Sequence, residues 1–412
     1  MNDTQPDNTT RAQLTDSPYA AMRLAVTLVI MTIGNGGMYV VAVMLPAVQA
    51  EFGVARGSAS LPYTLMMIGF GVGGVLMGRL ADRFGVMLPI LIASVSLGLG
   101  FVLAGLSNSI WTFILVHGIL IGFAGCAAMF APLIADTSLW FVRRRGIAVA
   151  ICASGNYLAG TIWPQIAQHL IELVGWRETY FWLAGFSFLS LAALAPLMRR
   201  RAPALVESGP MPASTAVPAS DRPFGFSPGK AQALLCVAGV ACCVAMSMPQ
   251  VHIVAYCGDL GYGAVRGAQM LSLMLAFGIV SRLISGVICD RIGGLRTLLL
   301  GSALQGVALL LFLPFDSLAS LFVVSALFGL FQGGIVPAYA IIIREYFPPR
   351  EAGARVGTVI MCTLLGMALG GWMSGVIFDL TGSYHAAFIN GIAWNFLNLA
   401  IVLYLMRRVR MI

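Results

Sequence analysis

Charged residues are scarce in this chain. Of its 412 residues only 10% are Asp, Glu, Lys or Arg, and 59% are hydrophobic. Soluble domains carry about 25% charged residues, and so few charges could not cover the surface of a folded soluble protein of this length. The composition therefore excludes a soluble globular protein and indicates one that lies in a lipid bilayer.

Several chemical signatures are also missing. No G-x-x-x-x-G-K-[ST] loop is present, which argues against an ATP-driven pump. The four histidines lie on different segments without metal-ligand spacing, and the eight cysteines lack the paired spacings of a zinc site or a disulfide framework. An intramembrane enzyme would need a clustered catalytic set. We therefore expect neither an enzyme nor a bound cofactor or metal.

Long apolar runs fill the sequence instead. A membrane-spanning helix needs about 20 apolar residues, and twelve runs qualify: 24–46, 61–78, 88–106, 111–139, 147–170, 179–198, 232–256, 267–289, 297–314, 319–343, 356–378 and 386–406. We predict an all-α membrane protein with twelve transmembrane helices.

Basic residues predict the orientation. With a cytoplasmic N-terminus, all but four of the 24 Lys and Arg residues fall on the cytoplasmic side; Arg56, Arg177 and Arg266 lie outside, and Arg282 lies within a span. The reverse topology would break the positive-inside rule. Both termini are therefore expected in the cytoplasm. The net charge of +8 follows from this asymmetry and requires no nucleic-acid partner.

A polar segment divides the chain in two. RRRAPALVESGPMPASTAVPASDRPFGFSPGK is rich in Pro, Ala and Ser, a composition typical of a flexible linker. The predicted organisation is a cytoplasmic tail, a six-helix bundle, a cytoplasmic linker, a second six-helix bundle and a short tail, over residues 1–22, 23–200, 201–230, 231–406 and 407–412.

The two halves repeat a short loop. GRLADRFG follows the second span and GVICDRIG follows the eighth, so both read G-x-x-x-D-R-x-G. Glycine permits a tight reversal between helices, and the aspartate can bond to a helix N-terminus or pair with arginine. We predict a cytoplasmic latch that opens and closes, formed by Gly78, Asp82, Arg83, Gly85, Asp290, Arg291, Asp136, Arg143 and Arg145.

On these repeated loops the chain resembles the major facilitator superfamily, over about residues 20–406. The resemblance implies two bundles related by an axis along the membrane normal, with a central site exposed alternately to each side. One departure is that the basic residue common after the final glycine of the first loop is absent, since Val86 and Met87 follow it.

Three stretches resemble the monocarboxylate transporter and oxalate–formate antiporter families: NGGMY in the first span, WFVRRRGIAVAICASGNYLAG entering the fifth, and PQVHIVAYCGDLG in the seventh. Two positions depart from that pattern. Asn35 stands where the motif often begins with an acidic residue, and Gly278 stands where animal members commonly have an aspartate one turn before the eighth-span arginine. A proton-coupling role of that pair cannot be transferred to this chain.

Arg282 is the strongest candidate binding residue, because an arginine at the centre of a span costs about 2.5–3.5 kcal/mol. Its helix face carries small residues, whereas the opposite face carries Met274, Phe277, Ile284 and Ile288 and is expected to face lipid. A guanidinium matches a carboxylate with a planar pair of donors. A structural salt bridge and a side chain that reaches to the cytoplasmic surface remain alternatives.

Other polar residues inside spans form a second group. We predict that the substrate site also contains His117, Asn35, Tyr39, His252, Tyr256, Tyr339, Gln332, Asn156 and Tyr157. A free histidine side chain titrates near neutral pH, and Asp259 shares the helix face of His252, so either residue could carry a proton. The alternatives are a backbone-bonded core histidine for His252 and a solvated loop residue for Asp259.

The sequence thus predicts a secondary transporter that moves a small organic anion together with a proton. A monocarboxylate such as L-lactate is the expected substrate, and an anion exchanger of the oxalate–formate type is the alternative. A dianion exchanger would favour a second basic residue in the membrane, which the sequence lacks. We expect a functional monomer in the lipid bilayer of a bacterial inner membrane.

Overall fold

The computed structural model describes residues 15–202, 223–348 and 351–409, and within these ranges every regular element is a helix. Twelve helical segments in the same ranges are long and apolar enough to cross a membrane. The predicted all-α class and number of spans are therefore confirmed, and the protein is a multi-pass membrane protein.

The first half contributes six spans, of which three consist of more than one element. The elements are α2 (Pro18–Gly34) with α3 (Gly36–Phe52), α4 (Arg56–Phe84), α5 (Met87–Gly105), α6 (Ile110–Val116) with η1 (His117–Gly125), η2 (Cys126–Met129) and α7 (Ala131–Trp140), α8 (Arg145–Val174), and α9 (Trp176–Leu194) with η3 (Ala195–Met198).

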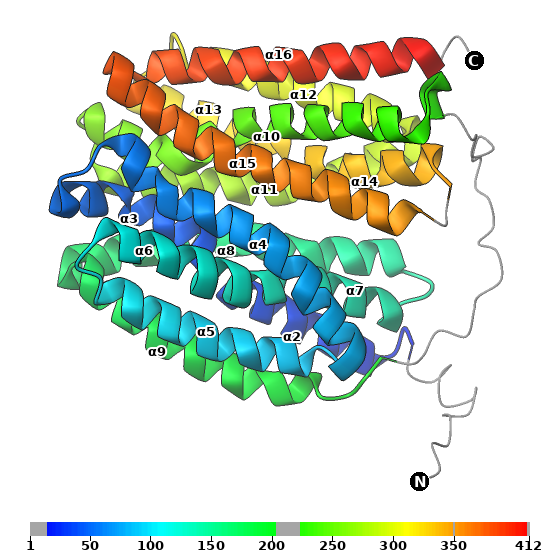
Figure 1. Cartoon of the computed structure of the whole chain (residues 1–412), viewed down its shortest axis with the longest axis horizontal. Coiled ribbons are helices and arrows are strands. Elements are labelled where there is room, and N and C mark those ends of the chain that lie inside the picture. Colours follow the sequence, from blue (N-terminus) through cyan, green and yellow to red (C-terminus); the bar gives the residue numbers. More distant parts are fainter. Residues whose placement is uncertain (1–14, 203–222, 349–350, 410–412) are drawn as a thin grey trace.

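The second half repeats this plan, as Figure 1 shows in green to red above the blue to green first half. A short turn, η4 (Pro223–Gly225), precedes the six spans. These are α10 (Pro228–Asp259), α11 (Ala264–Ile292), α12 (Gly294–Leu311), α13 (Leu318–Gln332) with α14 (Ile335–Tyr346), α15 (Ala352–Thr381) and α16 (Tyr384–Val409).

The helices extend beyond the predicted apolar runs. Helix α2 begins at Pro18, inside the predicted tail of residues 1–22, and α16 continues to Val409, inside the predicted tail of residues 407–412. Most of the predicted linker, residues 203–222, lies outside the described residues, as do residues 1–14 and 410–412. The first and last helices begin and end at the same end of the molecule (Figure 1).

Asn35 stands at a break in the first span. Its backbone lies between α2 and α3, and its amide nitrogen donates to the carbonyls of Met31 and Met129 at 3.0 and 3.4 Å. The carbonyl of Met31 also accepts from the backbone N–H of Asn35 at 3.0 Å, so the side chain adds a second bond there and ties the break to the carbonyl of Met129. The side chain is fully buried and stabilises the break.

The two repeated loops form the same turn. Gly85 ends α4 with φ +84°, and Gly293 ends α11 with φ +82°. Each accepts this left-handed backbone, which strains other residues, and each donates its N–H to the carbonyl four residues earlier, Ala81 and Cys289 respectively. The final glycine is thus repeated in both loops because each helix ends in a backbone conformation that favours glycine.

The halves touch along two antiparallel helix pairs, α4 with α15 and α8 with α11. On the first pair, Thr64 Oγ1 donates to the carbonyl of Ala368 at 3.1 Å. Farther along, a methyl group placed on Gly71 would lie 2.6 Å from the sulfur of Met361. We call the end where α4 begins the Arg56 end and the opposite end the Asp82 end.

At the Asp82 end the first pair separates. Gly74 and Gly78 follow Gly71 on the same face of α4, and Gly357 and Gly353 precede Met361 on the matching face of α15. A methyl group on any of these four glycines would meet no atom of the described residues within 4 Å. The contact between α4 and α15 therefore stops about halfway along the two helices.

Helices α8 and α11 also separate at the Asp82 end. A methyl group on Gly146 of α8 or on Gly286 of α11 would also meet no described atom within 4 Å, and both glycines are exposed. Gly286 lies one turn beyond Arg282 on the same helix face. Among the described residues, the two halves are thus in contact at the Arg56 end and apart at the Asp82 end.

Candidate functional site

The α8–α11 pair positions Arg282. Three contacts follow one another along it: Gly160 with Leu275, Tyr157 with Gly278, and Ala153 with Arg282. The small residues let the two helices approach closely. Arg282 makes the last of these contacts before the halves separate.

Arg282 points at the other half of the molecule. Its Nη1 donates to the carbonyl oxygen of Ala153 at 2.9 Å, and its guanidinium lies 4.4 Å from the ring centroid of Tyr157. The prediction for the opposite helix face holds for Phe277 and Ile284, which are exposed, but was wrong for Met274, which is fully buried against Gly329.

No described carboxylate neutralises the charge of Arg282. No ion pair of the described residues includes it, and its Nε is buried without a hydrogen-bond partner among them. A guanidinium has five N–H donors. Arg282 therefore retains several donors and a full positive charge.

Four polar residues of the first half are linked to this charge, either directly or through Tyr39. The hydroxyl of Tyr39 donates to Asn156 Oδ1 at 3.3 Å, and Tyr39 interacts electrostatically with Tyr63, Tyr157 and Arg282. We call Tyr39, Tyr63, Asn156, Tyr157 and Arg282 the Arg282 cluster. It joins α3, α4, α8 and α11, so both halves contribute to it.

The structure places three other predicted site residues inside the packing of one half. His117 bonds through Nδ1 to the carbonyl of Phe113 at 2.8 Å and through Nε2 to the hydroxyl of Tyr180 at 2.9 Å. Tyr339 donates to Asn398 at 3.1 Å, and Gln332 accepts from Gln250 at 3.2 Å. His117, Tyr339 and Gln332 therefore have their hydrogen-bond partners within their own half.

The remaining predicted residues lie at the Arg56 end. Asp259 accepts from the guanidinium of Arg56, and the same guanidinium donates to Gln49 at 2.9 Å and to the hydroxyl of Tyr384 at 3.1 Å. It also lies 4.3 Å from the ring centroid of Phe378. Asp259 is thus paired with Arg56 across the boundary between the halves.

A second carboxylate of the same end caps α4. Asp379 of α15 accepts from the backbone N–H groups of Arg56 and Gly57 at 2.8 and 2.7 Å. The positive end of a helix dipole and its free N–H groups favour such an anion. We call Arg56, Asp259, Asp379 and Tyr384 the Arg56 gate.

Next to this gate, His252 is enclosed within the second half. Its Nδ1 bonds to the hydroxyl of Tyr384 at 3.0 Å, and its Nε2 bonds to the carbonyl of Gly371 at 2.8 Å. Tyr256 packs its ring against Tyr384 and Phe388, and its hydroxyl is buried without a partner among the described residues. The prediction grouped these residues with Arg282, whereas the structure groups them with Arg56.

Among the described residues, no ion pair joins the predicted latch residues of the two repeated loops. Asp82, Arg83, Asp290 and Arg291 are exposed, and neither aspartate has an ion pair within the described part of the chain. The carbonyl of Arg83 accepts from Arg201 at 3.3 Å.

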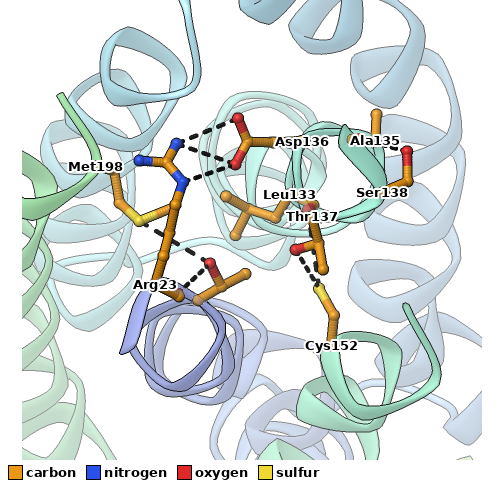
Figure 2. A network of polar contacts seen from close by, with 9 residues as sticks. Arg23, Leu133, Ala135, Asp136, Thr137, Ser138, Cys152 and Met198 are labelled. Atoms are coloured by element: carbon orange, nitrogen blue, oxygen red, sulfur yellow. Dashed lines mark hydrogen bonds and ion pairs between the residues drawn. The ribbon is translucent and has the colours of Figure 1, made fainter. Parts of the chain in front are cut away.

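The other predicted latch residues belong to the first half. Asp136 is held by Arg23, with three hydrogen bonds of 2.9–3.1 Å, and both side chains are buried. Figure 2 shows the Arg23 guanidinium reaching from α2 toward the Asp136 carboxylate on α7. The backbone N–H of Arg143 donates to Asp16 at 3.0 Å. The side chain of Arg145 lies outside the described residues.

The comparisons with known proteins decide the family. A family model of the Major Facilitator Superfamily matches residues 26–319 and 284–411. The chain belongs to the Major Facilitator Superfamily. As a member of this family it is a transporter rather than an enzyme.

The relatives of this transporter include a monocarboxylate transporter and transporters whose names give no substrate. The chain is 28% identical to monocarboxylate transporter 13 of Rattus norvegicus, over 80% of this chain and 75% of that protein. It is 27% identical to the MFS-type transporter pynF of Aspergillus niger, over 77% and 72%. It is 24% identical to the MFS-type transporter YhjX of Escherichia coli, over 79% and 80%.

Solved structures of other transporters share the fold. A peptide transporter POT in complex with sulfate aligns with a TM-score of 0.74 at 11% identity, covering 98% of each chain. A bacterial homolog of the human lysosomal transporter Spinster, in an inward-facing and occupied conformation, aligns with a TM-score of 0.69 at 15% identity. That alignment covers 96% of this chain and 98% of the other.

Proposed function

We propose that this transporter carries a small organic anion, namely a monocarboxylate such as L-lactate, together with a proton. The observation that carries the proposal is the unneutralised guanidinium of Arg282 at the contact between the two halves. A charge inside the membrane is expensive and marks a functional site by default. A bound carboxylate would neutralise it with a matched pair of charge-assisted hydrogen bonds.

The rest of the Arg282 cluster suits a small organic acid. Tyr39 and Asn156 offer hydroxyl and amide groups that can bond to a second polar group of the substrate. Tyr157 offers a flat apolar surface beside the charge. The five residues of the Arg282 cluster include one cation and no carboxylate. The cluster therefore favours a monoanion over a dianion or a cation.

Relatives lend support to the substrate class. Proteins from Rattus norvegicus and Bos taurus that are 28% identical to this chain are named monocarboxylate transporter 13. A relative from Paecilomyces divaricatus, 24% identical, is named an agnestins efflux protein. Others are named MFS-type transporters, with no substrate in the name. We infer a monocarboxylate here because the first group agrees with the chemistry of Arg282.

We further propose that the Arg56 end faces the outside and the Asp82 end faces the cytoplasm, as the distribution of basic residues predicts. The described conformation would then be closed to the outside and open to the cytoplasm. Alternating access would open the Arg56 gate and bring α4 and α15 together at the Asp82 end. Asp259 and His252 are the candidates for the proton carrier, and we propose a functional monomer in a bacterial inner membrane.

Transport assays in proteoliposomes test this function. Native protein should take up radiolabelled L-lactate faster when an inward proton gradient is imposed, with the membrane potential clamped at zero. Unlabelled L-lactate on the outside should compete, whereas an uncharged analogue such as methyl lactate should not. If uptake ignores the gradient but requires a preloaded anion inside, the protein is an exchanger of the oxalate–formate type and proton symport is wrong.

A further inference from the structure

A chain of hydrogen bonds joins the Arg56 gate to a buried histidine. It passes from Arg56 Nη1 to the hydroxyl of Tyr384 at 3.1 Å, then to His252 Nδ1 at 3.0 Å, and from His252 Nε2 to the carbonyl of Gly371 at 2.8 Å. His252 is fully buried and Tyr384 is 2% exposed. The hydrogen bonds thus connect the gate to His252, one of the two candidates for the proton carrier.

The direction of each hydrogen bond is fixed by its ends. The carbonyl of Gly371 only accepts, so His252 Nε2 carries a proton, and in a neutral ring Nδ1 is then an acceptor. Tyr384 must therefore donate its O–H to Nδ1, while its oxygen accepts from Arg56. The closed gate fits a neutral His252 with both of its nitrogens satisfied.

Protonation of His252 would remove this fit. With a proton on Nδ1 the ring has two donors, so the hydroxyl of Tyr384 would lose its acceptor and would have to turn toward another, such as the carboxylate of Asp259. That carboxylate is already bound to Arg56. The protonated ring would thus compete for the hydrogen bonds that close the gate.

The charged and titratable groups near His252 come from three helices besides its own or from its own helix. Arg56 of α4 and Asp379 of α15 act on it electrostatically, while Tyr384 of α16 bonds to it directly. On its own helix the titratable neighbours are Tyr256 and Asp259. Neither carboxylate bonds to the imidazole, because Asp379 is bound to backbone N–H groups and Asp259 to Arg56, so neither compensates a buried imidazolium directly.

We propose that His252 is the proton-binding residue of the Arg56 gate, held neutral while the gate is closed and protonated when it opens. By linkage, a proton that binds the open form more tightly shifts the population toward that form. Acid should therefore open the gate and alkali should close it. The inference rests on the proposed function in assigning the Arg56 end to the outside and the proton to the transport cycle.

The first half supplies a matched control. His117 is also buried and also bonds to a tyrosine hydroxyl and a backbone carbonyl, those of Tyr180 and Phe113. All three residues belong to the first half. Titration of His117 would therefore not break a contact between the halves.

Distances between spin labels at the Arg56 end test the proposal. In a variant with its eight cysteines replaced, nitroxides are attached at Ala50 of α3 and Leu380 of α15, both exposed residues of opposite halves. The full-length protein in lipid nanodiscs is examined by pulsed electron paramagnetic resonance from pH 8 to pH 5, without substrate. We expect two distances, the longer from the open gate and the shorter from the closed gate. The ratio of molecules with the longer distance to molecules with the shorter one should rise at least about threefold toward pH 5.

The variants separate the outcomes. His252→Gln keeps a donor and an acceptor but cannot titrate in this range, so its distance ratio should not respond to pH, whereas His117→Gln should respond like the native protein. Tyr384→Phe retains the ring packing and should raise the open fraction at pH 8. A native response in His252→Gln, or a flat response in the native protein, would overturn the proposal.

Failure of the proposed function would be recognised separately. The distances are measured without a carboxylate substrate. If the protein does not transport L-lactate but opens with acid through His252, the proposed substrate is wrong and the proposed role of His252 stands. Conversely, lactate symport with an unchanged response in His252→Gln would retain the function and contradict the inference.

Discussion

Arg282 of α11 donates a hydrogen bond of 2.9 Å to the carbonyl oxygen of Ala153 in α8, and this bond crosses between the two halves of the transporter. The same guanidinium lies against Tyr157, one turn farther along α8. A carboxylate bound to Arg282 would therefore meet a cation that already touches both halves. Substrate binding at this point can alter the contact on which the rocking of the halves depends.

Tyr157 provides a first prediction. Tyr157→Phe should have little effect on the KM for L-lactate, because a phenyl ring retains the cation–π contact with Arg282. Tyr157→Ala should raise KM about 2- to 30-fold, since the contact contributes about 0.5–2 kcal/mol. Initial rates of uptake over a range of lactate concentrations measure both. Equal KM values for the two variants would show that the ring does not position the charge.

The ion pair of the gate gives a second prediction. Asp259→Asn removes the charge that holds Arg56 across the boundary, whereas Glu51→Gln weakens the pair with Arg177 inside the first half. A partly exposed pair contributes about 0.2–1 kcal/mol, so Asp259→Asn should raise the ratio of open to closed molecules, read from the spin-label distances, about 1.4- to 5-fold. Glu51→Gln should leave that ratio unchanged, and a similar rise in both variants would contradict the assignment.

A third prediction concerns stability. Arg23→Ala leaves the Asp136 carboxylate buried without its partner (Figure 2), and breaking such a pair costs about 3–5 kcal/mol. The apparent Tm of the purified protein in detergent should fall clearly. Arg266→Ala, at an exposed arginine whose hydrogen bond is to Gln269, should leave the Tm nearly unchanged. Equal values would mean that the buried pair does not stabilise the first half.

The open faces at the Asp82 end yield a fourth prediction. Gly357→Leu should fit the described conformation, because its side chain would point into open space, but it should obstruct the approach of α15 to α4. Overpacking of this kind costs about 1–3 kcal/mol, so we expect maximal transport to fall about 5- to 150-fold with little change in Tm. Gly185→Leu, on a face of α9 with no neighbour within 4 Å, should transport normally. Normal transport by Gly357→Leu would contradict closure at this face.

Composition and pattern were sufficient to predict the spans and the halves, because a bilayer imposes length and apolarity on every spanning helix. The repeated octets also predicted two equal turns, which Gly85 and Gly293 form. The predicted runs were shorter than the helices, since polar residues such as Arg56 and Asp259 extend them beyond the apolar part. Breaks such as Asn35 change the backbone without changing hydropathy.

Long-range pairing could not be read from the sequence. Arg56 and Asp259 are 203 positions apart, and each was interpreted as a residue of an outer loop or helix end. The prediction placed Asp136 near Arg143 and Arg145, whereas Arg23 of the first helix is its partner. Tyr63 had no signal of its own, because a tyrosine in an apolar span is equally typical of packing.

The assignment of Arg282 as the substrate's anchor is tested most directly by proton-driven uptake of L-lactate in Arg282→Ala, Arg282→Lys and, as control on the same helix, Arg266→Ala. Loss of a charge-assisted hydrogen bond worth about 1.5–3 kcal/mol predicts at least a tenfold loss of kcat/KM in Arg282→Ala. Arg282→Lys should retain an intermediate value because an ammonium lacks the paired donors, and Arg266→Ala should match the native protein. Native uptake by Arg282→Ala would contradict the account.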